Sequence, residues 1–172
     1  MRKQAIMIAG ITGLAGLGVV LVLRMMVPQD ASATGLLRWQ DAAVVARGHA
    51  LYARDCAGCH GALDGRATTD PDARPPDAPP PDAPPHDARG HTWEHPDYAL
   101  FQLTKSGEVA ELCRTLDRGG MPQFGAAMSD QEIVAVLSYI KSTWPDELRA
   151  KQESVNALYA AQNAAHRELI HR

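Results

Sequence analysis

The sequence predicts an all-α fold, and three observations lead to that class. Apolar residues recur at the three- and four-residue spacing of amphipathic helices in several segments. One such segment begins with a capping box, in which Ser129 is followed three residues later by Glu132. No segment shows the alternation of polar and apolar residues that is typical of a half-buried β-strand.

Composition limits the size and the class of the protein. The 172 residues are 45% hydrophobic and 22% charged, which is enough for one core of modest size and too little for two. A formal net charge of -3 argues against the basic field that nucleic-acid binding requires. Aromatic residues make up only 5%, which is low for a core built from side chains alone. Three cysteines are too few for a miniprotein held by disulfides.

Residues 1–29 are expected to anchor the chain in a membrane. The run from Ala5 to Leu23 contains no charge, and as a helix it spans about 28 Å, close to the hydrocarbon thickness of a bilayer. A cleaved signal peptide is the other interpretation, with cleavage after Ala33 in a short stretch of small residues. In both cases the rest of the chain is exported. Because the chain starts with the basic residues Arg2 and Lys3, we expect the residues after Leu23 to lie on the outer side of the membrane.

Residues 30–145 are expected to form the main domain. An apolar stripe predicts a first helix over 41–54, with Val44, Gly48, Leu51 and Tyr52 on one face. A second helix is expected to begin with Pro96 at its first position and to end near Gly107, and a short one is expected around 109–116. The strongest helix signal begins at Ser129 and ends at the Trp144-Pro145 pair. Its apolar stripe consists of Ile133, Val136, Leu137 and Ile140.

Residues 146–172 are expected to be an appended amphipathic helix. Its apolar positions follow a loose helical spacing and are Leu148, Val155, Leu158, Tyr159 and Leu169.

Residues 71–90 form a proline-rich repeat with a period of five residues. Three copies read Pro-Asp-Ala-Arg-Pro or Pro-Asp-Ala-Pro-Pro, and residues 86–90 read as a decayed fourth copy. Such a run cannot form a helix or an inner strand, so polyproline II is expected. The repeat interrupts the main domain, so we expect a solvated surface insertion with little part in binding a cofactor.

The sequence Cys56-Ala57-Gly58-Cys59-His60 is a haem c attachment motif. Two thiols one helical turn apart can add to the two vinyl groups of a haem, and the imidazole of His60 then lies below the iron. A zinc site requires a second ligand pair that is missing, and a thioredoxin-like redox pair requires a βαβ context that is also missing. A simple disulfide is the remaining alternative. A haem would also compensate for the low aromatic content.

Met121 is the expected sixth ligand of the iron. It lies in a Gly-Gly-Met-Pro loop, where the glycines allow the backbone close to a planar cofactor. Met128 is the second choice. It is less favoured because it has a structural role available: it precedes a helix N-cap and can pack on Ile133 as a hydrophobic staple. A histidine is the third. A thioether opposite His60 suits a haem with a raised reduction potential.

These motifs together resemble a class I c-type cytochrome in its membrane-anchored bacterial form. The similar segments are Leu51-Tyr52 before the Cys-x-x-Cys-His motif, residues 120–125 around Met121, and residues 137–141, so that the resemblance covers about 40–145. It implies a cytochrome c fold around one covalent haem, with the first and last helices crossing near Gly48 and Tyr139, and a role in electron transfer. The proline-rich repeat departs from the compact members of that family.

A few chemically active residues remain outside this assignment. His86, His91 and His95 form a loose cluster that is either a second metal site, such as copper, or a set of polar loop residues or donors to haem propionates. Cys113 is expected to be a small buried core residue. The three tryptophans are expected to pack in the core or beside the haem.

The sequence therefore predicts a membrane-tethered, periplasmic monohaem cytochrome c that carries single electrons between respiratory or photosynthetic complexes. Because His60 and Met121 would fill both axial positions, it is expected to be a carrier and not by itself an enzyme. Its partners would be a redox protein donor and acceptor and the inner membrane, with no nucleic acid and no small-molecule substrate. The alternatives are a haem c subunit of a larger oxidoreductase, such as a terminal oxidase, and a copper-handling assembly factor.

Overall fold

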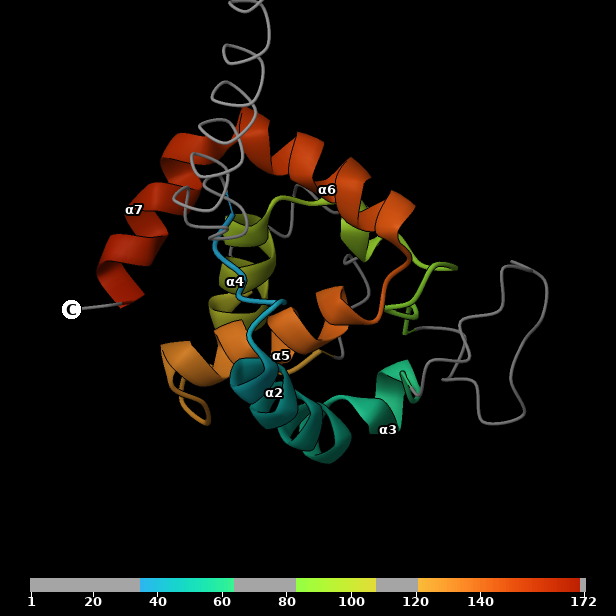
Figure 1. The fold of residues 1–172 in the computed structure, drawn as a ribbon. Helices are drawn as coiled ribbons and strands as arrows, with labels where there is room; N and C mark the ends of the chain where they lie inside the picture. Colours follow the sequence, from blue (N-terminus) through green and yellow to red (C-terminus); the bar gives the residue numbers. More distant parts are fainter. Residues whose placement is uncertain (1–34, 64–82, 108–120, 171–172) are drawn as a thin grey trace, which may run out of the picture. The chain divides into compact units, whose positions relative to one another are not determined.

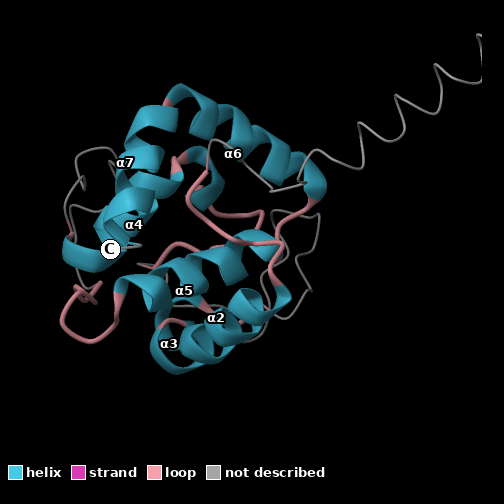
Figure 2. Ribbon diagram, turned by 60° about the vertical axis from the view of Figure 1, so that its left-hand side comes forward, coloured by secondary structure: helices cyan, strands magenta, loops and turns pink. Residues whose placement is uncertain are grey.

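The described part of the chain is helical, as predicted. The structure, a computed structural model, describes residues 35–63, 83–107 and 121–170, and these ranges contain no strand (Figure 2). The expected anchor, the short helix around 109–116 and Cys113 lie outside them. In chain order the elements are α2 (Ala42–Asp55), α3 (Ala57–His60), the 3₁₀ turn η1 (Thr92–Glu94), α4 (Asp97–Ser106), α5 (Asp130–Ser142), α6 (Asp146–Leu158) and α7 (Ala160–Ile170) (Figure 1).

Helices α2 and α5 pack directly against each other and cross at Gly48 (Figure 1). A Cβ atom added to Gly48 would lie 1.9 Å from the carbonyl oxygen of Ala135 and 2.9 Å from the Cβ of Tyr139. The crossing expected near Gly48 and Tyr139 is therefore confirmed. Glycine is required here because only a residue without a side chain lets the two backbones approach so closely.

The predicted boundaries of α2 and α5 are confirmed within one residue or two. The side chain of Asp41 caps α2 by accepting hydrogen bonds from the backbone N–H groups of Ala43 and Val44. These bonds lower the pKa of Asp41. The capping box of α5 is complete, since Ser129 accepts from the Glu132 backbone and Glu132 accepts from the Ser129 backbone.

The apolar core lies mainly between α2, α4 and α5 and also includes residues outside these helices, such as Leu36, Trp144 and Ile170. Its buried members are Leu36, Leu37, Leu51, Tyr52, Cys56, Leu63, Leu100, Phe101, Met128, Ile133, Val134, Ala135, Val136, Leu137, Tyr139, Ile140, Trp144 and Ile170. All four positions of the stripe predicted for α5 are among them. Burial of this surface at about 25 cal/mol per Å² is the main favourable term in folding.

Helix α4 begins one residue later than predicted and is capped by a distant segment. Pro96 is the N-cap and not the first helical residue, and it provides no side-chain cap. Instead, the Asn156 side-chain oxygen accepts from the Asp97 backbone N–H at 2.9 Å, and Asn163 accepts from the Tyr98 N–H at 2.9 Å. The helix ends at Gly107, as predicted, in a left-handed conformation with φ 73°.

The C-terminal tail is two helices, so the prediction of a single helix over 146–172 is wrong. Helices α6 and α7 are separated at Tyr159 and lie across the N-terminal end of α4 (Figures 1 and 2). The predicted apolar face is correct only in part, since Leu148 packs against the core but Leu158 is 81% exposed and Leu169 is 60% exposed. The buried face is polar because its amide side chains hydrogen-bond to α4. These amides are Gln152, Asn156 and Asn163, each fully buried.

Asp97 is the centre of a buried polar network that joins the tail to the core. One carboxylate oxygen of Asp97 accepts from the backbone N–H groups of Leu36 and Leu37, at 2.7 and 3.0 Å. The other oxygen accepts from Gln152 at 2.7 Å and lies 3.8 Å from the Lys141 ammonium. A charge that is buried in this way requires such partners, because an isolated carboxylate is strongly disfavoured away from water.

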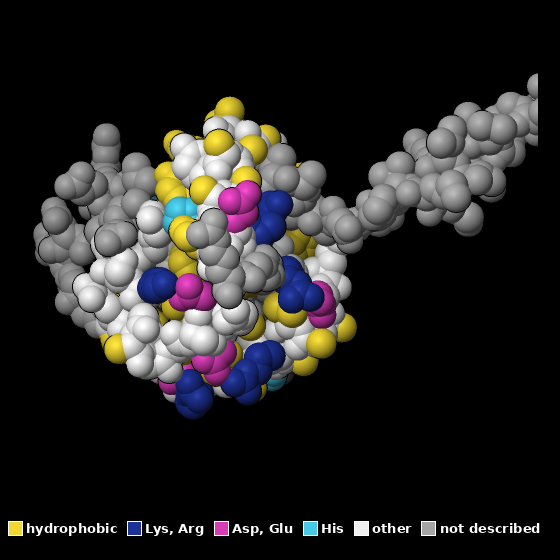
Figure 3. Space-filling view, turned by 90° about the vertical axis from the view of Figure 1, so that its left-hand side faces the viewer, with side chains coloured by type: hydrophobic (Ala, Val, Ile, Leu, Met, Phe, Trp, Pro, Cys, Tyr) yellow, Lys and Arg dark blue, Asp and Glu magenta, His cyan; other side chains and the backbone are white. Residues whose placement is uncertain are grey.

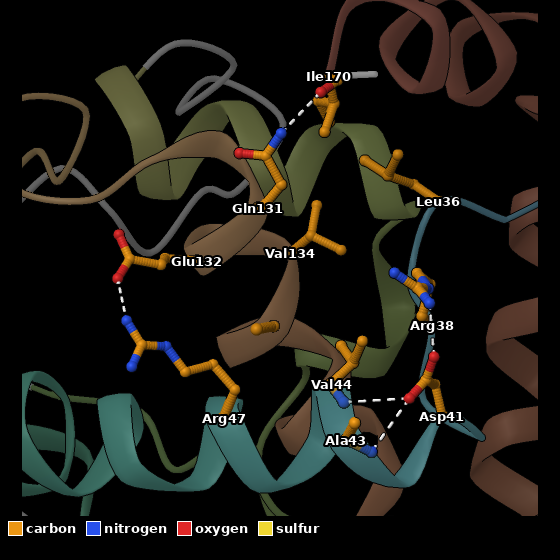
Figure 4. A pocket seen from close by; sticks show the side chains of 11 residues that line it. Leu36, Arg38, Asp41, Ala43, Val44, Arg47, Gln131, Glu132, Val134 and Ile170 are labelled. Atoms are coloured by element: carbon orange, nitrogen blue, oxygen red, sulfur yellow. Dashed lines mark hydrogen bonds and ion pairs between the residues drawn. The ribbon is translucent and has the colours of Figure 1, made fainter.

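The surface outside this network is mixed in charge. Lys and Arg side chains lie beside Asp and Glu at several places on the face shown in Figure 3. A groove of about 430 Å³ opens between the start of α2 and the start of α5, with Val44 and Val134 in its wall and the Arg47–Glu132 ion pair at its edge (Figure 4). It lies at the opposite end of α2 from Cys56.

Candidate functional site

The Cys-x-x-Cys-His motif lies at the junction of α2 and α3. Cys56 ends α2, and its carbonyl accepts from the backbone N–H groups of Cys59 and His60 at 3.1 and 3.0 Å. The two thiols are thus one helical turn apart, as expected from the spacing. Gly61 ends the turn with φ 78°, a conformation that disfavours other residues.

The two cysteines are unpaired and differ in exposure. Cys56 is buried and Cys59 is exposed, and both are free thiols, so the disulfide alternative is not formed. Burial, with smaller contributions from Asp55 and Cys59, raises the pKa of the Cys56 thiol to about 11. Both sulfurs are therefore available for another bond.

Two tyrosine hydroxyls hold the chain that follows the motif. Tyr52 donates to the Gly61 carbonyl at 2.8 Å, and Tyr139 donates to the Leu63 carbonyl at 3.0 Å. The tyrosine rings also pack on each other, with centroids 5.5 Å apart. Because these residues belong to α2 and α5, the helix crossing fixes the position of the motif.

The His60 ring is oriented by a backbone carbonyl. Its Nδ1 lies 2.8 Å from the Pro84 oxygen. A carbonyl can only accept, so in the neutral ring Nδ1 carries the proton and Nε2 keeps its lone pair. Histidines that bind metals in proteins are usually held in this way. The arrangement therefore leaves Nε2 ready to bind a metal ion.

The end of the proline-rich repeat packs against His60, which corrects the expectation of a solvated segment with little part in the site. The His86 ring stacks on the His60 ring, with centroids 4.1 Å apart and planes 28° apart. Residues 86–90 form a turn and not polyproline II, since the Gly90 N–H donates to the Asp87 carbonyl at 3.1 Å. The earlier copies, up to residue 82, lie outside the described residues.

Met121 comes from a different part of the fold. It is partly exposed at the start of the irregular segment 121–128. This segment is joined to the end of α4 by backbone hydrogen bonds from Phe124 to the Thr104 carbonyl and from Gly125 to the Lys105 carbonyl, at 3.0 and 2.8 Å. Met128, in contrast, is 5% exposed and lies in the same buried cluster as Ile133.

The histidine cluster separates into two parts. His86 belongs to the His60 site, whereas His91 and His95 flank η1, with ring centroids 5.5 Å apart. Burial lowers the pKa of both His86 and His95. Among residues 35–63, 83–107 and 121–170, no group of three or more His, Cys, Asp or Glu side chains is placed to hold a metal ion.

Pro84 and Thr92 are residues of the site that the sequence did not reveal, and the Thr92 hydroxyl lies 2.8 Å from Nδ1 of His86. His86 was expected only as a member of the histidine cluster. Pro84 acts through its backbone oxygen, so its side chain gives no signal. His86 did offer one, because it occupies the position that proline holds in the other copies of the repeat. Trp144, expected to pack in the core or near the haem, is 2% exposed and donates to the His86 carbonyl at 2.7 Å.

A helical fold with one Cys-x-x-Cys-His turn and an oriented histidine defines the class of proteins that bind a haem c covalently. A family model described as cytochrome c matches residues 45–144. The chain belongs to the cytochrome c family. No curated protein and no solved structure matches this chain.

The cofactor of this family is covalent haem c, and the residues present fit it. Cys56 and Cys59 supply two free thiols on one turn, and His60 supplies an unprotonated ring nitrogen. The family also assigns the general role, which is electron transfer by a carrier. The match ends at residue 144, so α6 and α7 lie outside it.

Proposed function

We propose that this chain is a monohaem electron carrier, tethered to the bacterial inner membrane with its haem domain in the periplasm. Cys56 and Cys59 form the thioether bonds, and His60 and Met121 are the axial ligands. The observation that supports the site best is the hydrogen bond from His60 Nδ1 to the Pro84 carbonyl, since it directs the other ring nitrogen to a metal.

Burial supports Met121 over Met128 as the sixth ligand. Met128 is enclosed in the apolar core, so its sulfur could reach a haem only if that core opened. Met121 is partly exposed and lies in an irregular segment, which favours it as a ligand. Histidine and methionine together fill both axial positions and raise the reduction potential. Such an iron passes electrons and has no position for a substrate.

Substitution of the two methionines tests the site. Met121→Ala should abolish the near-infrared band of thioether-bound ferric haem and lower the reduction potential, because a nitrogen or oxygen ligand favours the ferric state more than a thioether does. Met128→Ala is the matched control. It should keep the band and cost about 2 kcal/mol of stability through the cavity it leaves in the core. Loss of the band in Met128→Ala, with the band kept in Met121→Ala, would reverse the assignment.

The membrane tether rests on the uncharged run from Ala5 to Leu23. This run precedes the described residues, and within the described ranges no helix is long and apolar enough to cross a bilayer. Cell fractionation should place the haem protein in the membrane. N-terminal sequencing that starts at Thr34 would instead indicate a cleaved signal peptide.

The partners are proposed to be redox proteins of respiratory or photosynthetic electron transfer. Isolation of the full chain in a mild detergent tests whether it moves freely between them. A carrier should separate from other subunits as a single haem polypeptide. Stable co-migration with other subunits would assign it to a larger oxidoreductase, such as a terminal oxidase.

A further inference from the structure

The His86 ring lies face to face with the ring of the axial histidine. The two ring centroids are 4.1 Å apart and the planes are within 28° of each other. We propose that His86 is a positioning residue that fixes the rotation of the His60 ring and tunes the potential of the iron, an inference that rests on the function proposed above.

Three contacts hold His86 in place. Its Nδ1 is 2.8 Å from the hydroxyl oxygen of Thr92, which is 8% exposed. Its backbone carbonyl accepts from the indole N–H of Trp144 at 2.7 Å. The Tyr52 ring meets it edge-on, with centroids 6.2 Å apart. A ring that is fixed on its polar edge and along its backbone can restrain a neighbour that stacks on its face.

His60 is consequently held in two ways. The Pro84 carbonyl accepts from Nδ1 at its edge, and the His86 ring covers one face. The hydrogen bond alone permits some rotation of the ring about the bond to Cβ, whereas a stacked ring opposes that rotation sterically. The orientation of an axial imidazole affects the electronic structure of a low-spin ferric haem, so the contact has a spectroscopic consequence.

The polarity of His86 has a second consequence. Oxidation of the iron adds one positive charge, and polar groups beside the ligand stabilise that charge. The imidazole of His86 is such a group next to His60, and the hydroxyl of Thr92 hydrogen-bonds to that imidazole. Replacing them with apolar groups should therefore disfavour the ferric state and raise the potential.

His86→Leu removes both the flat ring and its polarity. In the full-length haem protein we expect altered electron paramagnetic resonance g values and a higher midpoint potential, with the near-infrared band of the thioether ligand retained. Retention of this band shows that the sixth ligand is unchanged. A protein whose g values and potential equal those of the parent would show that His86 only packs, and the proposal would be wrong.

Thr92→Val removes the hydroxyl and keeps the shape of the side chain, so it tests the polar part of the proposal even if His86→Leu does not accumulate. We expect a smaller rise in potential. Thr92→Ser keeps the hydroxyl and should have the parent potential. An unchanged potential in Thr92→Val would contradict the contribution of the Thr92 hydroxyl to the potential.

His49→Leu is the matched control on α2. This histidine is exposed, and its ring packs on Tyr139 at 4.9 Å and not on His60. It should leave the g values and the potential unchanged, and a shift as large as that of His86→Leu would overturn the inference. Failure of the proposed function has a different signature: the parent protein itself would lack the near-infrared band.

Discussion

The hydroxyl of Tyr52 joins the haem-binding turn to the helix pair. It is buried and donates to the Gly61 carbonyl, directly after the Cys-x-x-Cys-His motif. Burial, with smaller contributions from Cys56 and Tyr139, raises the pKa of Tyr52 above its usual value of 10.0. The hydrogen bond that holds the motif therefore requires the Tyr52 hydroxyl to stay protonated.

Tyr52→Phe should lower the free energy of unfolding by about 1–2 kcal/mol at pH 7, because the Gly61 carbonyl loses its buried partner. The difference from the parent should shrink above pH 10. There the tyrosine ionises in the unfolded chain while it stays protonated in the folded one, so the parent loses stability and the phenylalanine variant does not lose this contribution. Urea unfolding between pH 7 and 11 measures both effects.

Tyr159→Phe is the control for this experiment. The ring of Tyr159 packs on Tyr98, with centroids 5.6 Å apart, and phenylalanine keeps that contact. Its stability at pH 7 should stay within about 0.5 kcal/mol of the parent. A constant difference between the parent and Tyr52→Phe from pH 7 to 11 would contradict the burial of the Tyr52 hydroxyl.

At the residue scale, what could be predicted was local in sequence. The turn at Cys56, Cys59 and His60 follows from spacing alone, because five consecutive residues define it. The partners of His60 could not be predicted, since Pro84 and His86 reach it across 24 and 26 residues. One of them acts through a backbone atom that every residue possesses.

At the scale of elements, the crossing of α2 and α5 depends on the absence of a side chain at Gly48. Gly48→Val should cost about 3 kcal/mol of stability, because its Cβ would lie far inside the van der Waals contact distance to the Ala135 carbonyl oxygen and the helices would have to separate. Thermal unfolding followed by circular dichroism gives the change. Gly58→Ala is the matched control, since a Cβ there meets nothing within 4 Å. Equal melting temperatures for the two variants would contradict the crossing.

The tail caps α4 from a distance, and α4 in turn holds the segment that starts at Met121. The double variant Asn156→Ala/Asn163→Ala leaves two backbone N–H groups of α4 without partners, at a cost of about 1–2 kcal/mol each. We expect the near-infrared band to be lost on heating at a lower temperature than in the parent. Gln162→Ala, at an exposed position of α7, should leave that temperature unchanged. A parent-like temperature in the double variant would show that the tail does not support the loop.

The sequence predicted the helices of the domain better than the tail, for a physical reason. The signals of α2 and α5 were an apolar stripe and a capping box, and both act within one helix. The tail buries Gln152, Asn156 and Asn163 because their amides satisfy α4, and hydrophobic periodicity cannot identify a buried polar face. The break at Tyr159 has no proline or glycine to mark it.

At the scale of the whole molecule, the family domain and its tail form one compact unit. The described residues belong to a single compact unit, Ala31–Arg172, in which the tail packs on η1 and α4. A haem with histidine and methionine ligands in such a unit is closed to further ligands at both axial positions. Electron transfer then requires no opening of the fold.

Exposure of the reduced full-length protein to carbon monoxide at neutral pH tests this central claim most directly. A carrier whose iron is bound by His60 and Met121 predicts no change in the visible spectrum, while Met121→Ala should bind the gas. A parent protein that binds carbon monoxide under the same conditions would have an open axial position. That result would contradict a simple electron carrier and indicate ligand chemistry at the iron.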